Sequence, residues 1–421
     1  MFDSNKIDCY FEENKNLNNQ IEEKSLTSKW TRFVKLGFPC IAAALLGMMI
    51  ILPNIKKSVD LRDNITMPRK NELEKLHIEE TVFSAVDDKN RINTVIADSV
   101  DEVEPGSQKV KFNNPKGSIP TDKGWIRIIA DEGYFTQNDN ILELEHNIKA
   151  VIEEKTTVTT EHAVYDFNKE FGYGKKEINA VGDWGTLTAP EFTYDKKEEV
   201  LTLIGLNEIK SDKGSLTAEK ETKVFQKENK TISQGNAILS QNDNSVRANE
   251  IVAYFTDKTH KELKRVEAYG DVVVKTPTER ATGSEGYFET QTGKLELFGK
   301  NGVVKVVRED NTLTASHIIA YFSTGKKQEL LKVEASGKVV VTTPKGTASG
   351  NKGEYNPQTN LVELFGNVRI EQNGNFLIGE HAETDLTTSV SRLKGGEKTG
   401  GRISGIFYNK RKQNNGGDTK E

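Results

Sequence analysis

The sequence predicts an all-β protein built from stacked rungs of about 30 residues. The main observation is an internal repeat. Residues 248–299 align with residues 315–366 without a gap, and about half of the 52 paired positions are identical. Within this repeat, ELKRVEAYGDVVVKTP from Glu262 returns as ELLKVEASGKVVVTTP from Glu329. A repeat of this fidelity is typical of architectures in which each unit stacks on its neighbours.

A finer repeat extends over most of the chain. An alanine followed five to seven residues later by an aromatic or apolar residue recurs roughly every 30 to 34 residues. Its members start at Ala130, Ala189, Ala218, Ala248, Ala281, Ala315 and Ala348, with weaker members at Ala97, Thr160 and Gly379. At about 3.3 Å per residue, this spacing holds two or three short strands with their turns. We therefore expect ten rungs between about residues 76 and 408.

The composition suits narrow stacked sheets with large solvated surfaces. Only 35% of the 421 residues are hydrophobic and 29% are charged, which would make a thin core for a compact globule. The net charge of −5 is small, and no basic stripe or array of stacking aromatic residues is present. These features argue against a nucleic-acid partner. Cys9 and Cys40 both precede the repeats, so the repeat body has no disulfide or thiol chemistry.

The first 53 residues predict a tail and a membrane anchor. Residues 1–29 are polar and lack periodicity, which indicates a disordered cytoplasmic tail. Residues 30–53 predict a transmembrane helix, because Lys35 is the one charge between Phe33 and Leu52, and Trp30 suits the interface.

A cleaved signal peptide is the alternative to the membrane anchor. The polar lead of about 30 residues and the length of the apolar run disfavour it. Lipidation of Cys40 is disfavoured because Phe38 and Pro39 precede it. Positive charges flank the run on both sides and do not set its orientation. We place the tail inside because the β body is the part to be exported.

The rest of the chain divides into a linker, two β segments and a tail. Residues 54–75 are charged and contain Pro68, which predicts a linker. We expect one β segment over residues 76–210 and a second over residues 211–408. Both show the alternation of apolar residues expected for strands, separated by Asn-, Asp- and Gly-containing turns. Residues 409–421 predict a disordered tail.

No catalytic or metal-binding motif is present in the sequence, so the chain is predicted to be neither an enzyme nor a cofactor protein. His162, His317 and His381 occupy matching rung positions. A structural repeat explains them better than a metal site, because neither a cysteine nor a close pair of carboxylates completes a ligand set. The recurring glycines are expected in turns or bulges; they are Gly270, Gly286 and Gly299 and their copies Gly337, Gly353 and Gly366.

Function can be carried by the apolar side of the strands, where alternate residues are aliphatic. Two interpretations compete: two sheets packed as a dry sandwich, which the pattern alone favours, or sheets that splay and leave a groove for acyl chains. Candidate groove residues are Ile126, Ile128, Leu142, Leu144, Ile148, Leu201, Leu203, Val272, Val274, Leu295, Leu297, Val304, Val306, Val339, Val341, Leu364, Val368 and Ile370. In an open groove an aspartate at Leu297 should be hydrated and should block lipid without unfolding the protein, whereas Glu296 should face outward.

Specific motifs resemble a known family. Residues 30–210 contain FNNPKG, GWIRIIADEGYF, LELEHNIKA, TTEHAVYDF and GDWGTLTAPEFTYD, and together with the membrane helix they resemble LptC. Residues 211–408 contain SQGNAILSQNDNSVRANEIVAYF, EAYGDVVVKT, LELFGKNGVVKV, NFLIGEHAETDL and GGRISGIF, and are similar to LptA of the OstA family. The order of these motifs identifies an LptC–LptA fusion of the lipopolysaccharide transport family, whose two parts are normally separate chains.

The resemblance implies an open twisted β-jellyroll, or β-taco, whose groove holds the acyl chains of lipopolysaccharide. It implies an inner-membrane, single-pass protein with its C-terminal body in the periplasm. Its implied partners are lipopolysaccharide, the inner-membrane Lpt ABC transporter and either an outer-membrane LptD-like acceptor or further LptA-like jellyrolls joined by edge strands. The alternative is a membrane-tethered β-solenoid scaffold or adhesin. An unbroken aliphatic lane through all rungs is expected of the conduit alone.

Overall fold

The described part of the chain is entirely β-structure. The computed structural model describes residues 77–86, 91–104, 107–121, 124–256, 262–299, 302–324, 329–385, 387–388, 390–396 and 403–406. These residues form 30 strands and contain no α-helix, so the all-β class is confirmed. Accordingly, no helix able to span a membrane is found in this part of the chain. The expected tail 1–29, membrane helix 30–53, linker 54–75 and tail 409–421 lie outside the described residues.

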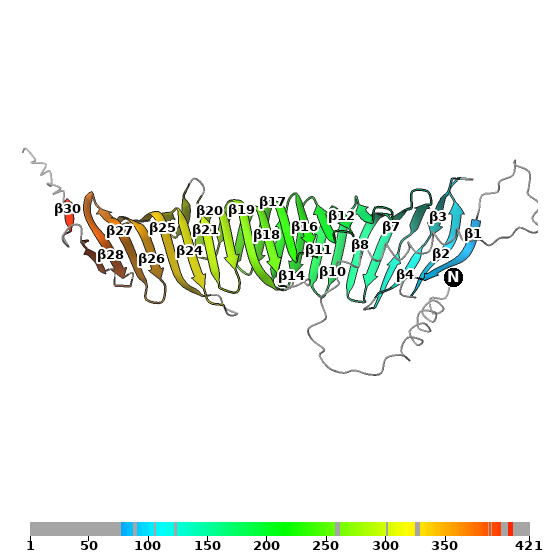
Figure 1. Cartoon of the computed structure of the whole chain (residues 1–421), viewed down its shortest axis with the longest axis horizontal. Helices are drawn as coiled ribbons and strands as arrows, with labels where there is room; N and C mark the ends of the chain where they lie inside the picture. Colours follow the sequence, from blue (N-terminus) through cyan, green and yellow to red (C-terminus); the bar gives the residue numbers. More distant parts are fainter. Residues whose placement is uncertain are drawn as a thin grey trace, which may run out of the picture. The chain divides into compact units, whose positions relative to one another are not determined.

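The strands follow one another in chain order (Figure 1). We call β1–β13 the N-terminal region; it consists of β1 (His77–Val86), β2 (Ile92–Glu102), β3 (Lys109–Asn113), β4 (Lys116–Thr121), β5 (Gly124–Ile129), β6 (Glu132–Thr136), β7 (Ile141–Ile152), β8 (Thr156–Asp166), β9 (Phe171–Gly174), β10 (Ile178–Gly182), β11 (Gly185–Ala189), β12 (Glu191–Asp195) and β13 (Val200–Ile204). The join consists of β14 (Asn207–Ser211), β15 (Gly214–Ala218), β16 (Glu221–Phe225) and β17 (Lys230–Gln241).

The C-terminal region comprises β18 to β30. Its strands are β18 (Asn244–Phe255), β19 (Leu263–Lys275), β20 (Glu279–Glu289), β21 (Lys294–Phe298), β22 (Val304–Arg308), β23 (Asn311–Ala315), β24 (His317–Phe322), β25 (Leu330–Thr343), β26 (Gly346–Asn356), β27 (Leu361–Gln372), β28 (Asn375–Asp385), β29 (Val390–Lys394) and β30 (Ser404–Ile406). Turns between strands place asparagines in left-handed conformations, as at Asn140 and Asn360, which these residues tolerate better than most.

All pairings are antiparallel, and they link the 30 strands into one ladder that has two halves. Long strands such as β8, β17, β20 and β25 contribute one end to each half. Between them, half-sheet one continues through β9–β12–β13–β16 and then β21–β24. Over the same part of the chain, half-sheet two continues through β10–β11–β14–β15 and then β22–β23. Both halves are hydrogen-bonded across the join.

Bulges mark the line at which the two half-sheets meet. In five long strands two consecutive residues adopt positive φ: His146–Asn147, Gly235–Asn236, Gly270–Asp271, Gly337–Lys338 and Gly366–Asn367. The strand register shifts at each of these places. A Cβ at Gly270 would lie 2.6 Å from Asn249 Nδ2, so a side chain there would clash. The predicted bulge role of Gly270, Gly337 and Gly366 is therefore confirmed.

Two of the predicted turn glycines have a different role. Gly286 and Gly353 lie inside β20 and β26, not in turns. A Cβ at Gly286 would approach Leu297 Cδ2 to 3.1 Å, and one at Gly353 would approach Leu364 Cδ2 to 3.2 Å. These glycines make room for a leucine on the neighbouring strand, which an alternating sequence pattern does not reveal.

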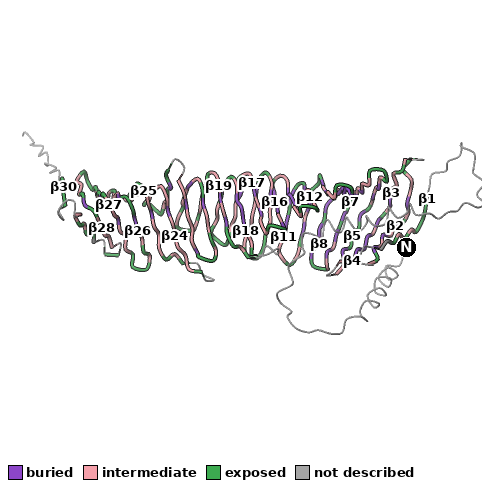
Figure 2. The backbone as a smooth tube through the Cα atoms, in the orientation of Figure 1, coloured by how far each residue is buried: buried purple, intermediate pink, exposed green. Residues whose placement is uncertain are grey.

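Two hydrophobic cores lie along the ladder; buried positions are purple in Figure 2. The first core belongs to the N-terminal region and includes buried aromatic residues, namely Phe112, Phe135, Tyr165, Phe167, Phe192 and Tyr194. The second runs from Ala218 to Ala382, and its buried members are aliphatic and often alanine. Many half-buried aliphatic residues pack against the second core, whereas few hydrophobic residues do so against the first.

Candidate functional site

The predicted groove residues all lie on the strand faces that turn toward the core. Most of them are buried, namely Ile126, Ile128, Leu142, Leu144, Ile148, Leu201, Leu203, Val272, Leu297, Val304, Val339, Leu364 and Val368. The remaining five are half-buried, namely Val274, Leu295, Val306, Val341 and Ile370. Half-burial of an aliphatic side chain on an inward face indicates that the two half-sheets do not cover it fully.

Leu297 does not have the environment that its place in the repeat suggested. Its residue exposure is 3%, and it packs against Gly286 in the second core. An aspartate at Leu297 would therefore lack water in the folded state, which is the environment expected at this position of a dry sandwich and not of an open groove. Leu295, two residues earlier on the same face of β21, is half-buried and is the position at which a charge could be hydrated.

An aliphatic row follows half-sheet two from β5 to β28. Each of its residues is the cross-strand partner of the next: Ile128, Ala150, Val158, Ala180, Leu187, Ile209, Leu216, Leu239, Val246, Val274, Ala281, Val306, Leu313, Val341, Ala348, Ile370 and Leu377. We call this set the aliphatic row. No polar side chain interrupts it, even at the join.

The exposure of the aliphatic row changes at the join. Its members up to Leu187 are buried, and from Ile209 onward they are half-buried. Because the residue types stay aliphatic while burial falls, the change lies in the coverage by the opposite half-sheet. The C-terminal region thus presents an apolar lane that is partly accessible, whereas the N-terminal region keeps the same lane closed.

A second row follows half-sheet one, nearer the line of bulges. It runs by cross-strand pairing through Phe192, Leu203, Thr222, Ser233, Ile251, Ala268, Gly286, Leu297, Ile318, Ala335, Gly353, Leu364 and Ala382. We call this set the inner row. All its residues are buried. Thr222 and Ser233 interrupt its apolar character at the join.

The outward faces carry the charges. Lys332 Nζ lies 2.8 Å from Glu334 and 2.9 Å from Glu354, and these carboxylates raise the pKa of Lys332. Glu296 faces outward, as the sequence predicted, and pairs with Lys294 and with His317. The Lys294 ammonium is the main cause of the lowered pKa of Glu296. Such pairs keep the outer surface soluble while the inward faces stay apolar.

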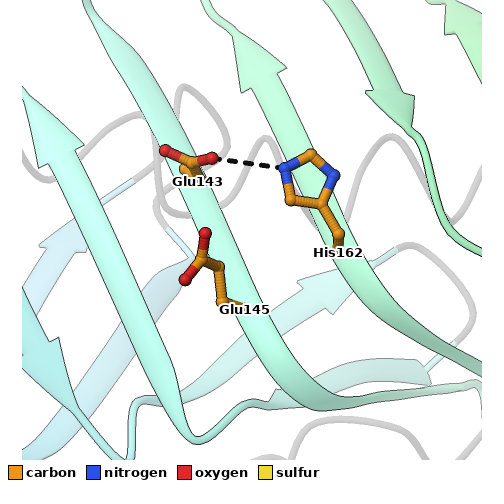
Figure 3. A group of neighbouring side chains, drawn as sticks. All are labelled: Glu143, Glu145 and His162. Carbon is orange, nitrogen blue, oxygen red and sulfur yellow. Dashed lines mark hydrogen bonds and ion pairs between the residues drawn. The ribbon is translucent and has the colours of Figure 1, made fainter.

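One outward cluster has the composition of a metal site. Glu143 and Glu145 on β7 and His162 on β8 place their ligand atoms within 4.8 Å of one another (Figure 3). The expectation that no close carboxylate pair accompanies the histidines is therefore wrong here. Residues two apart on a strand share a face, and Glu145 is the cross-strand partner of His162.

The hydrogen bonds of His162 explain the cluster without a metal ion. His162 Nε2 lies 3.2 Å from Glu143 Oε1, and the backbone N–H of Lys175 donates to Nδ1 over 3.5 Å. With Nδ1 accepting, the proton is on Nε2 and is directed at Glu143. A metal-bound imidazole instead donates its second N–H to a neighbour. The absence of a metal remains a prediction.

The same histidine–glutamate pair recurs in the C-terminal region. His317 Nε2 lies 3.1 Å from Glu296, and His381 Nε2 lies 3.4 Å from Glu363. In these copies a phenylalanine replaces Glu145, and the His317 ring stacks on Phe298 with centroids 4.3 Å apart. The recurrence identifies these histidines as parts of the structural repeat.

Comparisons with known families assign both regions. Residues 39–211 match the family described as lipopolysaccharide-assembly, LptC-related. Residues 217–326 and 300–390 match the family described as LptA/(LptD N-terminal domain) LPS transport protein. The chain is an LptC–LptA-like member of the Lpt family. LptC and LptA proteins are non-enzymatic, so this Lpt protein is not an enzyme.

A solved structure also resembles the Lpt chain. It is the crystal structure of LptH, the LptA homologous periplasmic component of the lipopolysaccharide transport device from Pseudomonas aeruginosa. The sequences are 12% identical, the alignment covers 46% of this chain and 94% of that chain, and the TM-score is 0.14. No curated protein matches the chain.

Sequence patterns missed many members of the aliphatic row. Ile209, Leu216 and Leu313 lie in strands of five residues, in which two or three apolar positions give a weak alternation signal. The polar positions Thr222 and Ser233 were missed because threonine and serine on a strand are ordinarily assigned to the solvent face. Alternation within the strand could have found Thr222, because it lies two residues before Val224, whereas Ser233 has Thr231 and Gly235 at the corresponding positions.

Proposed function

We propose that this Lpt protein accepts lipopolysaccharide from an inner-membrane ABC transporter and passes it along its inward face toward the outer membrane. The aliphatic row carries this proposal. It offers acyl chains one continuous apolar surface across both regions, which a scaffold or adhesin with a dry core would not need. The family assignment supports lipopolysaccharide transport as the process.

Hydrophobic transfer supplies the affinity. Each CH₂ group moved from water onto an apolar surface contributes roughly 0.8 kcal/mol. The half-buried residues from Ile209 to Ile370 are the ones able to provide that surface, because fully buried residues already have protein neighbours. In the N-terminal region the half-sheets must separate before a lipid can contact the row.

The chain organisation and partners belong to the same proposal. Residues 30–53 anchor the chain in the inner membrane, residues 76–210 form the LptC-like jellyroll and residues 211–408 form the LptA-like jellyroll. The terminal strands β29 and β30, which both pair with β28, offer an edge to which an LptD-like acceptor or another LptA-like jellyroll could add a strand. N-terminal sequencing of the mature protein tests the anchor: a start after about residue 44 would show cleavage.

Photo-crosslinking in living cells tests the lipid path. A photoreactive amino acid at Val246 or Leu313, both half-buried in the aliphatic row, is expected to crosslink to lipopolysaccharide. The matched control is Thr314, the outward neighbour of Leu313 in β23, which should not crosslink. Crosslinking to protein alone from both inward positions would favour the scaffold or adhesin alternative.

A further inference from the structure

Buried polar side chains gather at the join of the two regions. Asn207, Thr222, Gln226, Thr231 and Ser233 each have at most 4% of their surface exposed. We call these five residues the polar belt. Among the described residues after Ser233, no other buried polar or charged residue occurs. The belt spans the boundary between the two family matches: Asn207 lies in the LptC-related match, which ends at residue 211, and the other four residues lie in the LptA match, which begins at residue 217.

The belt faces inward. Thr222 and Ser233 are consecutive members of the inner row, with Leu203 before them and Ile251 after them. Thr231 pairs with Val224, which is buried on the same face. Two adjacent strands, β16 and β17, thus present hydroxyl groups where the strands on either side present aliphatic or aromatic groups.

The polar atoms of the belt are incompletely paired. Thr222 Oγ1 and Ser233 Oγ lie 3.0 Å apart and share one hydrogen bond, which leaves a second hydroxyl proton and further lone pairs. Gln226 Nε2 is buried and has no hydrogen-bond partner, and the same is true of Asn207 Oδ1. The Asn207 Nδ2 group is held by the carbonyls of Gly205 and Ala218.

Core packing does not account for the belt. A valine and an alanine would fill the volumes of Thr222 and Ser233, and the same inward rows use these types elsewhere. Burying an unpaired amide or hydroxyl costs free energy unless a partner arrives. Unpaired donors and acceptors on an inward face are therefore suited to a ligand that brings both kinds of group.

We propose that the polar belt is a binding site for an acyl chain that carries a hydroxyl group and is joined to its headgroup through an amide or ester. The chain hydroxyl hydrogen-bonds to the Thr222–Ser233 pair. Because this pair is fully buried in the inner row, the half-sheets must separate at the join before the lipid reaches it, as in the N-terminal region. Gln226 lies four residues after Thr222, about 13 Å farther along the strand direction, so its amide is available to a polar group of the headgroup. This site rests on the proposed function, since it is a station on the lipid path, and it distinguishes hydroxyacyl from plain acyl lipids at the join.

The test uses the full chain in nanodiscs and two radiolabelled probes, N-myristoyl-glucosamine and N-(β-hydroxymyristoyl)-glucosamine. The wild-type protein is expected to bind the hydroxylated probe about fivefold to tenfold more tightly, the factor that one net hydrogen bond provides. The double variant Thr222→Val with Ser233→Ala should bind both probes equally. Thr222→Ser, which keeps both hydroxyls, should retain the preference.

Thr202→Val is the matched control, because Thr202 is buried to a similar degree but lies on the opposite face of β13 from Leu201 and Leu203. It should leave the preference unchanged. If the double variant does not fold, as judged by thermal melting, Thr222→Val alone replaces it and should also lower the preference.

Equal binding of both probes by the wild-type protein would overturn the hydroxyacyl site alone. A preference that persists in the double variant would do the same. Failure of the wild-type protein to bind either probe would overturn the proposed lipid path, and the belt site with it.

Discussion

The N-terminal and C-terminal regions belong to the same ladder and carry apolar side chains at the same inward positions. They differ in how fully the half-sheets cover those side chains. In the N-terminal region Phe135, Tyr165 and Phe167 are buried and in contact, with ring centroids of Tyr165 and Phe167 4.9 Å apart. In the C-terminal region the corresponding half-sheet carries Phe288, Leu295 and Val333, which are half-buried.

The size of the inward side chains explains this difference. Aromatic residues bury 150–250 Å² each and can fill the space between two half-sheets. The second core is built on alanines and valines, such as Ala248, Ala315 and Val339. These short side chains fill only the space near the line of bulges. They do not cover the aliphatic residues that lie farther from that line. The comparison teaches that closure depends on side-chain volume, not on strand pairing.

The largest expected change in stability comes from placing an aspartate at an inward position in each region. Leu203→Asp should destabilise the N-terminal region by more than about 4 kcal/mol, because Leu203 is fully buried and has no water to hydrate a carboxylate. Leu295→Asp should cost only about 1–2 kcal/mol, since its half-buried site can be hydrated. Urea unfolding followed by Trp125 and Trp184 fluorescence and by circular dichroism measures both. Equal losses would contradict the difference in closure.

The bulge line gives the next comparison. Gly270→Ala should cost about 2–3 kcal/mol, because φ is +74° and the new Cβ would meet Asn249. The N-terminal region places His146 in the same conformation, with φ of +62°. His146→Gly should therefore stabilise the protein by up to about 1 kcal/mol. Thermal melting checks both, and a stabilised Gly270→Ala would show that the bulge does not require glycine.

Acid stability should depend more on the N-terminal region. Burial alone would raise the pKa of Asp166, but hydrogen bonds from the Lys169 ammonium and from backbone N–H groups lower it overall. A lowered folded-state pKa means that this stabilisation is present above the ordinary pKa of about 3.8 and is lost as pH falls through the folded-state value.

Asp166→Asn should cost about 1.5 kcal/mol at neutral pH and nothing once the carboxyl is protonated. Asp385 in the C-terminal region is the control. Its pKa is also lowered, by the N–H groups of Thr388 and Thr387, but Asp385 is half-buried whereas Asp166 is buried. Unfolding titrations between pH 2 and pH 7 should show a shallower acid decline for Asp166→Asn than for Asp385→Asn. The reverse order would contradict this assignment.

The smallest effect is expected on the outward faces. Glu296→Ala and Glu143→Ala each remove the acid of a histidine–glutamate pair, and each should change stability by about 0.5 kcal/mol or less. Similar values in both regions would show that the regions differ only in their interiors. A loss well above 1 kcal/mol for Glu143→Ala alone would point to a particular role for the Glu143–Glu145–His162 cluster.

The sequence by itself determined the all-β class and which alternate residues of the strands face inward. Alternation of apolar residues requires a strand with one dry face, so Val272, Leu297 and Val368 could be placed inside without coordinates. The left-handed glycines Gly270 and Gly366 followed from the repeat, because a glycine that recurs at the same place in successive copies indicates a recurring turn or bulge with positive φ.

Only the tertiary structure decided which inward residues are covered. Leu295 and Leu297 look equivalent in sequence, yet one is half-buried and the other is in the core, because exposure depends on the opposite half-sheet. Register likewise brought Glu145 beside His162 and placed Thr222 against Ser233, residues that are 17 and 11 positions apart. Cross-strand neighbours are set by turn lengths and bulges summed over the ladder, and a local pattern carries no information about that sum.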